Sequence, residues 1–519
     1  MHISVPVQPI SKREENFREL FIDKISRGMF QCQKILYHSL GINCKLSGSI
    51  YAASEIEGAI PLIHGPKGCT YHQRLTPMKM YSPISCLPCT EMDENDVIYG
   101  GAEKLKEKIK EVYQVHNPPL ILVLPTCTSA LIGDDVAGIC EDLNSQIPCP
   151  VVSVASEGFA HRRRESLEGL MKETLKSWRM TTPPDYDIRG CGQEEVFLAL
   201  VDQLMEEQDV EENLVNMEFP CLMRYWGRAD REEVKRIFAK MGAGLNTTLL
   251  SGTVEEVKRA PRARLNIVSR QRLGAKKMEE RFGTGYLRKW MNHYGLDGME
   301  EFLLEVGEKL GREGEAEEVA RKEKLQAQEA LRRPKRTFSR HSFAIFTQDF
   351  FFTPFLAGIY CNDLGLPIKY FCVSTYLLRS TNVLEETIEG MLNTMEELFA
   401  EWGTRFEMVV NPTLDELGEI SKNVDYLVSD RPSPLNFGKL VDVSDAHFHL
   451  FRTGFSGMVE FGRYVASQLN KSTAVQDRRS ILSRFDYDPN YYPLINDLNG
   501  SASRQIWMHM WCQKEVWRD

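Results

Sequence analysis

The chain contains no long apolar run, and its cysteine density is modest. No uncharged apolar stretch approaches the roughly 18 residues that a membrane-spanning helix needs, and the N-terminal segment has no apolar core of signal-peptide length. Thirteen cysteines in 519 residues are too few for a disulfide scaffold. We therefore expect a cytoplasmic protein with no membrane partner, in a compartment where thiols stay reduced and available to metals.

An excess of positive charge is also absent. The chain has 63 lysines and arginines against 73 aspartates and glutamates, which gives a formal net charge of −10. This balance excludes the basic footprint of a general nucleic-acid-binding protein, so we expect no nucleic-acid partner. At roughly 100 to 200 residues a domain, the length predicts about three domains.

Short apolar segments alternate with helical patterns in the first part of the chain. Residues 61–65, 120–126 and 148–156 are apolar runs bounded by Gly, Pro and Ser, which is typical of strands. Residues 100–115 and 134–144 have the periodicity of helices. Such alternation predicts parallel strands joined by crossover helices.

The same alternation recurs further along and predicts an α/β fold of three Rossmann-like domains, each a parallel sheet flanked by helices. We place the domains at residues 1–205, 206–335 and 336–519, the last with a C-terminal extension. The second domain ends in a charged segment, about residues 287–336, in which acidic and basic residues alternate. That pattern predicts a solvated surface helix between domains.

Three cysteines, Cys44, Cys69 and Cys127, lie in separate turns, and the predicted strand at 120–126 leads directly into the third. Iron in iron–sulfur clusters is held by cysteine thiolates, and usually by four of them. Three cysteines are one fewer than this usual number. If a second polypeptide supplies the missing ligand, the cluster lies at a subunit interface. The alternative for any one of these cysteines is burial in the core as a small apolar residue.

Three motifs surround these cysteines: HGPKGC at residues 64–69, EMDENDVIYGG at 91–101 and TCTSALIGDDV at 126–136. In this order they resemble the first domain of the nitrogenase component 1 superfamily. The separations of 25 and 58 residues between successive cysteines resemble the β-type subunit of dinitrogenase more than the α-type subunit.

The resemblance implies that the three cysteines bind half of an eight-iron P-cluster. An α-like subunit would supply the other half, in an α2β2 heterotetramer. Other members of the superfamily use comparable cysteines for a 4Fe–4S cluster, which is the alternative. His64, Gly65 and Gly68 precede the second ligand, and we expect them to position the backbone near the cluster.

Two segments depart from the α-type pattern. Residues 259–268 resemble the stretch before the cysteine that anchors the catalytic cofactor, but Ser269 follows. Near the C-terminus, Phe451 best matches the cofactor-binding histidine, with His447 and His449 offset. The chain should therefore not hold an active-site cofactor through the usual pair, and we assign it no catalytic residue. His447 and His449 stay secondary candidates for a metal or substrate site, with a surface pair as the alternative.

Cys86 and Cys89 form a CxxC pair, which could bind a metal or shuttle a disulfide. A lone pair falls short of the paired spacing that is typical of zinc sites, so we treat both cysteines as secondary candidates.

By the same resemblance, electrons would arrive from an ATP-dependent iron protein and pass through the interface cluster to a catalytic centre in the α-like partner. Within the superfamily, we interpret the chain as the β-type subunit of a methylthio-alkane reductase, a nitrogenase-like system that cleaves carbon–sulfur bonds. The alternatives are a dinitrogenase β subunit and a cofactor-assembly scaffold subunit without turnover. Outside the family, a binding protein with structural cysteines is a further alternative.

Overall fold

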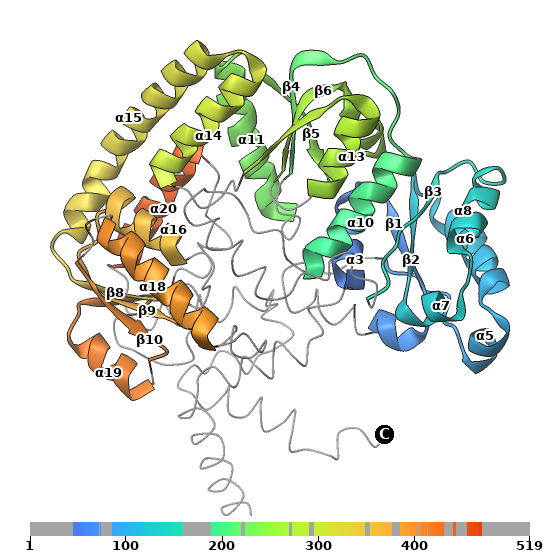
Figure 1. The fold of residues 1–519 in the computed structure, drawn as a ribbon, viewed down its shortest axis with the longest axis horizontal. Coiled ribbons are helices and arrows are strands. Elements are labelled where there is room, and N and C mark those ends of the chain that lie inside the picture. Colours follow the sequence, from blue (N-terminus) through green and yellow to red (C-terminus); the bar gives the residue numbers. More distant parts are fainter. Residues whose placement is uncertain are drawn as a thin grey trace, which may run out of the picture.

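The computed structural model describes residues 45–71, 73, 86–158, 188–218, 224–268, 272–289, 295–347, 353–375, 385–401, 403, 405–412, 414–429, 440–442 and 454–469. The predictions for Cys44, His447 and His449 lie outside these ranges. Three parallel sheets follow one another along the chain, and the second lies between the first and the third (Figure 1). The α/β fold with parallel sheets flanked by helices is as predicted.

The first sheet has the strand order β1-β2-β3, and all of its strands are parallel. Its strands are almost entirely buried, as expected for a parallel sheet covered by helices on both faces. They are β1 (Ile60–His64), β2 (Ile121–Pro125) and β3 (Val151–Ser153). The accompanying helices are α3 (Lys45–Glu55), α5 (Glu94–Tyr99), α6 (Ala102–His116), α7 (Cys127–Ile132), α8 (Val136–Asn144) and α10 (Ile188–Gln203).

The second sheet has the order β5-β4-β6-β7 and is also parallel. Asn216, Asn246 and Asn266 hydrogen-bond to one another across its three neighbouring strands, so these amides are satisfied inside the sheet. The strands are β4 (Glu211–Glu218), β5 (Gly244–Leu249), β6 (Ala263–Val268) and β7 (Gly285–Arg288). The helices are α11 (Arg224–Lys240), α12 (Val254–Lys258), the 3-10 turn η1 (Ala260–Arg262) and α13 (Arg272–Phe282).

The third sheet has the order β10-β9-β8-β11-β12, again with parallel neighbours. Its strands are β8 (Phe343–Thr347), β9 (Ile368–Val373), β10 (Glu407–Val410), β11 (Tyr426–Ser429) and β12 (Leu440–Asp442). Its helices are α16 (Thr353–Gly358), the π-helical turn η3 (Ile359–Asp363), α18 (Glu385–Glu401), α19 (Leu414–Lys422) and α20 (Gly454–Gln468).

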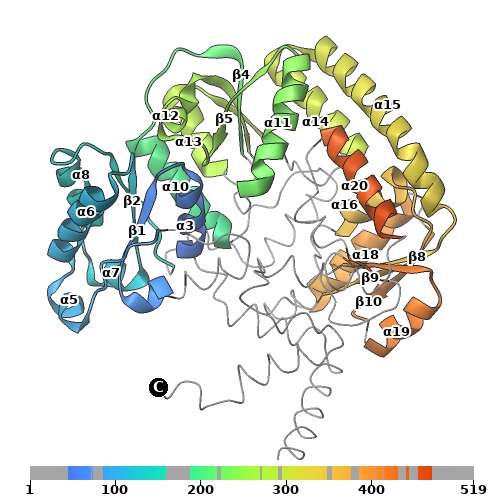
Figure 2. The same cartoon turned by 180° about the vertical axis from the view of Figure 1, so that it is seen from behind.

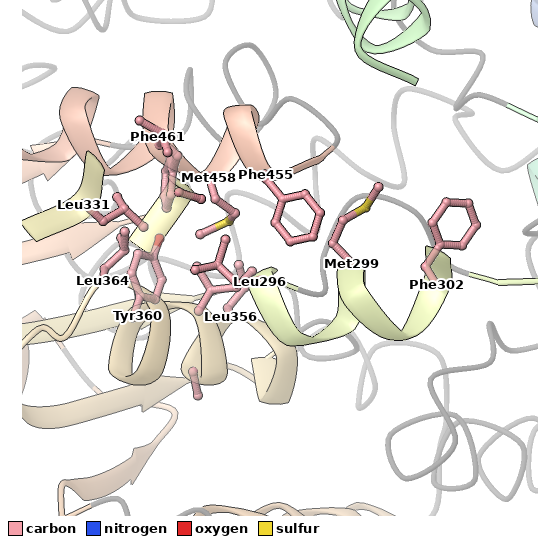
Figure 3. Packing of buried hydrophobic residues seen from close by; sticks show 14 of the residues in the cluster. Leu296, Met299, Phe302, Leu331, Leu356, Tyr360, Leu364, Phe455, Met458 and Phe461 are labelled. Carbon is pink, nitrogen blue, oxygen red and sulfur yellow. The ribbon is translucent and has the colours of Figure 1, made fainter. Parts of the chain in front are cut away.

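The charged segment forms two helices, α14 (Gly295–Leu310) and α15 (Glu313–Phe338), and the prediction of a solvated helix is incomplete. One face of α15 is buried, from Ala316 to Phe338, and α15 packs against α14 and α20. Leu331 of α15 lies beside Leu364, which follows Asp363, and beside Phe461 of α20 (Figure 3). Small apolar residues recur at helical spacing between the charges, so α15 joins the core rather than only covering it.

The apolar cores continue across the predicted domain boundaries. Helix α10, from the first predicted range, packs against α13 from the second. Leu46 and Phe197 belong to the same apolar cluster as Val254 and Met278. The boundaries at 205 and 335 therefore stay predictions. In the part of the chain that the structure describes, no helix is both long enough and apolar enough to cross a membrane.

Candidate metal centre at the edge of the first sheet

The turns that lead to Cys69 and Cys127 lie next to each other because β1 and β2 are parallel neighbours in register. His64 and Pro125, the last residues of the two strands, are paired. Beyond this pair, the Thr126 N–H donates a hydrogen bond to the His64 carbonyl oxygen at 3.0 Å. Both views show α7, which begins at Cys127, at the end of this sheet (Figures 1 and 2).

Close approach of the two turns requires glycine at position 65. A Cβ atom on Gly65 would collide with the side chain of Thr126, so a larger residue would force the turns apart. The Ser129 hydroxyl of α7 adds a hydrogen bond of 2.8 Å to the His64 carbonyl. Gly68 differs, because a Cβ there would meet nothing within 4 Å.

The two cysteines have the properties of cluster ligands. Both are half-buried, and neither is in a disulfide. The Gly158 N–H, in the turn after β3, donates to Cys127 Sγ at 3.2 Å. Hydrogen bonds from the protein to sulfur are a recurring feature of iron–sulfur sites. The Thr70 hydroxyl, beside Cys69, is buried and has no hydrogen-bond partner in the described part of the chain.

The described residues do not hold a complete ligand set. Among them, no three or more His, Cys, Asp or Glu side chains are grouped in a way that could bind a metal ion. Cys44 immediately precedes Lys45, the first described residue. The thiol donors and the N–H···S bond fit an iron–sulfur group, and completing it would require Cys44 and further ligands.

His64 is fully buried between Asp134 and Thr90. Its Nε2 lies 2.9 Å from Asp134 Oδ2, and its Nδ1 lies 3.1 Å from Thr90 Oγ1. Burial lowers the pKa of His64 below its usual value, and the hydrogen bond and charge of Asp134 oppose this shift only in part. A carboxylate can only accept, so a neutral His64 donates from Nε2 and accepts the Thr90 hydroxyl at Nδ1.

Cys86 and Cys89 have different partners. Their segment runs beside β1, with hydrogen bonds from Ile63 N–H to Pro88 O and from Thr90 N–H to Ile63 O. Cys86 Sγ lies 3.7 Å from His116 Nε2, whereas Cys89 Sγ donates to the Gly65 carbonyl at 3.2 Å.

The two thiols also pack on opposite faces. Cys86 contacts one apolar cluster of the first sheet and Cys89 belongs to another. In extended chain, residues three apart point to opposite faces, which explains this arrangement.

Sequence reasoning missed the residues that brace the cysteine loops. Asp134 was visible within the TCTSALIGDDV motif, but nothing in the sequence connected it with His64. Lys45, the residue after Cys44, is buried and pairs with Glu195 of α10 at 3.2 Å. The Ser47 hydroxyl donates to Gln73 Oε1 at 2.8 Å and so ties α3 to the segment that carries Cys69.

Large apolar side chains are exposed near the cysteine loops. Ile98 and Tyr99 of α5 are 70% and 85% exposed, and Leu131 of α7 is 74% exposed. Helices α5 and α7 contact each other, so these side chains lie on neighbouring helices. We call Ile98, Tyr99 and Leu131 the apolar surface.

A parallel α/β fold with paired thiol-bearing turns defines the class of protein. Residues 44–470 match the family model "Nitrogenase component 1 type Oxidoreductase", and the chain belongs to this family. The predicted resemblance is therefore confirmed. Proteins of this family bind iron–sulfur clusters and form heterotetramers with an alpha/beta partner.

Individual relatives are similar over part of their length. The chain is 30% identical over 300 residues to the nitrogenase iron–molybdenum cofactor biosynthesis protein NifE of Nostoc sp., covering 55% of this chain and 54% of that protein. It is 27% identical over 266 residues to the nitrogenase molybdenum–iron protein alpha chain of Clostridium pasteurianum, covering 48% and 44%. The chain thus spans about half the length of the curated relatives it matches.

The solved structure "Nitrogenase Cp1 at pH 6.5" has a TM-score of 0.51 and 17% identity, and the match covers 82% of this chain and 88% of that one. At this identity the likeness shows the fold alone. The relatives named above are a NifE and an alpha chain, and they do not test the predicted β-type assignment or carbon–sulfur chemistry.

Proposed function

We propose that the chain is one subunit of a nitrogenase-type reductase and holds half of an iron–sulfur cluster. Cys44, Cys69 and Cys127 would be its ligands, and an α-like partner in an α2β2 assembly would complete the site. The observation that carries this proposal is the register of β1 and β2, which brings the Cys69 and Cys127 turns side by side.

The chemistry of these loops supports electron transfer. When bound, the cluster, of P-cluster type or alternatively 4Fe–4S, would supply one-electron transfer at low potential. The protein must hold the thiolate ligands and restrict the access of water to the cluster. The Gly158 N–H bond to Cys127 and the close packing of Gly65 on Thr126 serve those two needs.

The apolar surface supports docking of a separate electron donor. Monomeric proteins rarely leave several large apolar side chains together in water, so such a surface indicates a partner. Ile98, Tyr99 and Leu131 lie on α5 and α7, and α7 begins at Cys127. A donor seated here would be close to the cluster loops. We propose the ATP-dependent iron protein as that donor.

The final acceptor would lie in the α-like partner. Ser269 follows the stretch that leads to the cofactor-anchoring cysteine in α-type subunits, so this chain offers no thiol there. We propose a β-type role in methylthio-alkane reduction, with dinitrogen as the competing substrate. The similarity to NifE favours a second candidate, a cofactor-assembly scaffold subunit that holds a cluster without turnover.

The test is anaerobic co-purification with the α-like partner, followed by iron analysis and electron paramagnetic resonance. We expect Cys69→Ser to lose iron and weaken association with the partner. The matched control is Cys140→Ser, because Cys140 is buried in a different apolar cluster from the one that Cys69 contacts. A colourless, iron-poor wild-type complex would refute the cluster.

Turnover then separates the two candidates. A reductase subunit should support donor- and ATP-dependent loss of volatile thioethers or reduction of dinitrogen. A scaffold should instead carry a cluster that can be transferred to an acceptor protein, with no steady-state turnover on either substrate.

A further inference from the structure

A network of buried polar groups closes the end of β1. The His64 imidazole connects Asp134, at 2.9 Å, with Thr90, at 3.1 Å. The Asp134 carboxylate also accepts the Gly101 N–H at 3.0 Å. We call His64, Thr90, Asp134 and Gly101 the His64 network. Its members come from four separate segments of the chain: the end of β1, the segment beside β1, the start of α6 and the turn after α7.

One arm of the network holds the turn that leads to Cys69. Thr90 Oγ1 accepts the Gly65 N–H at 3.0 Å, four residues before that cysteine. The Met92 N–H donates to the Gly65 carbonyl at 3.0 Å and fixes the other side of the same residue. The backbone of Gly65 is therefore held on both sides by the segment that contains Thr90.

A second arm holds the start of α7. The His64 carbonyl accepts both the Thr126 N–H, at 3.0 Å, and the Ser129 hydroxyl, at 2.8 Å. Asp134, which follows α7, donates its own N–H to the Ser129 carbonyl at 3.3 Å. Cys127 lies between these anchored positions, and the Asp134 side chain connects the end of its helix to the His64 imidazole.

A third arm reaches the apolar surface. Gly101 joins α5 to α6, and a Cβ atom there would lie 2.9 Å from His64 Cε1. Only glycine allows the end of α5 to approach this closely. Through Asp134, the helix that carries Ile98 and Tyr99 is thus fixed to the strand end from which the cysteine turns depart.

We propose that His64 and Asp134 are positioning residues that hold the Cys69 and Cys127 loops, together with α5, in their binding arrangement before any metal is present. The identity of the bound group rests on the proposed function, but the positioning does not. Hydrogen bonds to a buried carboxylate are strong, and leaving a buried partner unsatisfied is costly. The loops should therefore keep their arrangement in the metal-free chain.

The test measures alkylation of individual cysteines in the metal-free full chain by mass spectrometry. His64→Leu removes both imidazole hydrogen bonds, and we expect Cys69 and Cys127 to react at least about tenfold faster. Cys372, buried in an apolar cluster of the third sheet, reports global unfolding, and Cys140, buried in an apolar cluster of the first sheet, reports opening of that sheet; neither rate should change. His64→Gln, whose amide both donates and accepts, should restore slow labelling.

A second pair of variants keeps the test decisive if His64→Leu does not fold. Asp134→Asn keeps the shape but removes the charge, and it should also accelerate Cys69 and Cys127. The matched control is Asp135→Asn, because Asp135 accepts the Gly138 N–H at the start of α8 and not His64. The proposal is overturned if Asp134→Asn leaves both rates unchanged, or if it accelerates the buried reference cysteines equally.

The readout separates this proposal from the proposed function. Selective acceleration in a chain whose wild type never binds iron would keep the positioning role and refute the cluster. If the variants label at the wild-type rate in a chain that binds iron through Cys69, the positioning role is refuted and the cluster is kept.

Discussion

Asp363 should make the stability of the protein fall as pH rises through neutrality. Its Oδ2 accepts the Leu296 N–H at 3.1 Å at the start of α14, and the side chain is buried. Burial raises the pKa of Asp363 from 3.8 to about 7, and the hydrogen bond from Leu296 opposes that shift only in part. At about 1.4 kcal/mol per pKa unit, full ionisation would cost about 4 kcal/mol of folding free energy.

The direction of the change in stability with pH follows from the direction of the pKa shift of Asp363. A carboxyl whose pKa is higher in the folded than in the unfolded protein stabilises the fold below the unfolded value, near 4, and that stability is lost as pH rises through about 7. Asp363→Asn removes the ionisation and retains an acceptor for Leu296. The variant should match wild type near pH 4 and melt at a higher temperature at pH 8.

The assay is the melting temperature of both proteins between pH 4 and pH 8. The difference between them isolates Asp363 from all other titrating groups. Asp297→Asn is the matched control, because this carboxylate follows Leu296 in α14, at the same contact with η3, but is 80% exposed. A difference between Asp363→Asn and wild type that stays constant across the pH range would refute the reasoning.

Two further predictions concern the metal centre. Gly65→Ala should lower the free energy of unfolding by about 1–3 kcal/mol and reduce iron content, because the added Cβ collides with Thr126. Gly68→Ala is the control and should change neither quantity, since a Cβ there meets nothing within 4 Å. Thermal melting and iron analysis measure the two effects. Tyr99→Ser should slow donor-driven reduction but not reduction by a small chemical reductant, measured by stopped flow. Val115→Ser, exposed on α6, is its control, and equal slowing with both reductants would contradict donor docking.

Local patterns in the sequence were sufficient to predict the strands of the first sheet, whereas the candidate ligands stay a prediction. β2 forms where an apolar run leads into Cys127, and α6 forms where charged and apolar residues alternate at helical spacing. These features depend on residues close in the chain. The buried face of α15 escaped prediction because charge dominates its composition, and only packing on α14 and α20 shows which face is apolar.

Contacts between distant residues could not be predicted in the same way. His64 and Asp134 are 70 positions apart, and their hydrogen bond depends on the register of β1 and β2 and on where α7 ends. The sequence suggested a backbone-positioning role for His64. It contained no signal for the carboxylate that fixes the imidazole.

The chemistry of the three sheet ends explains why the first one is the candidate for redox function. Each parallel sheet offers the carboxyl ends of its strands as a binding edge. The second sheet presents Arg288 and the buried cation Lys289 there, and the third presents buried hydroxyls, such as Thr347 and Ser429. Cys372, near the end of β9, is sealed among apolar residues, and burial raises its pKa to about 12. Iron–sulfur clusters need thiolates, so of the sheet ends that the structure describes, the first, with its half-buried cysteines and N–H···S bond, fits that need.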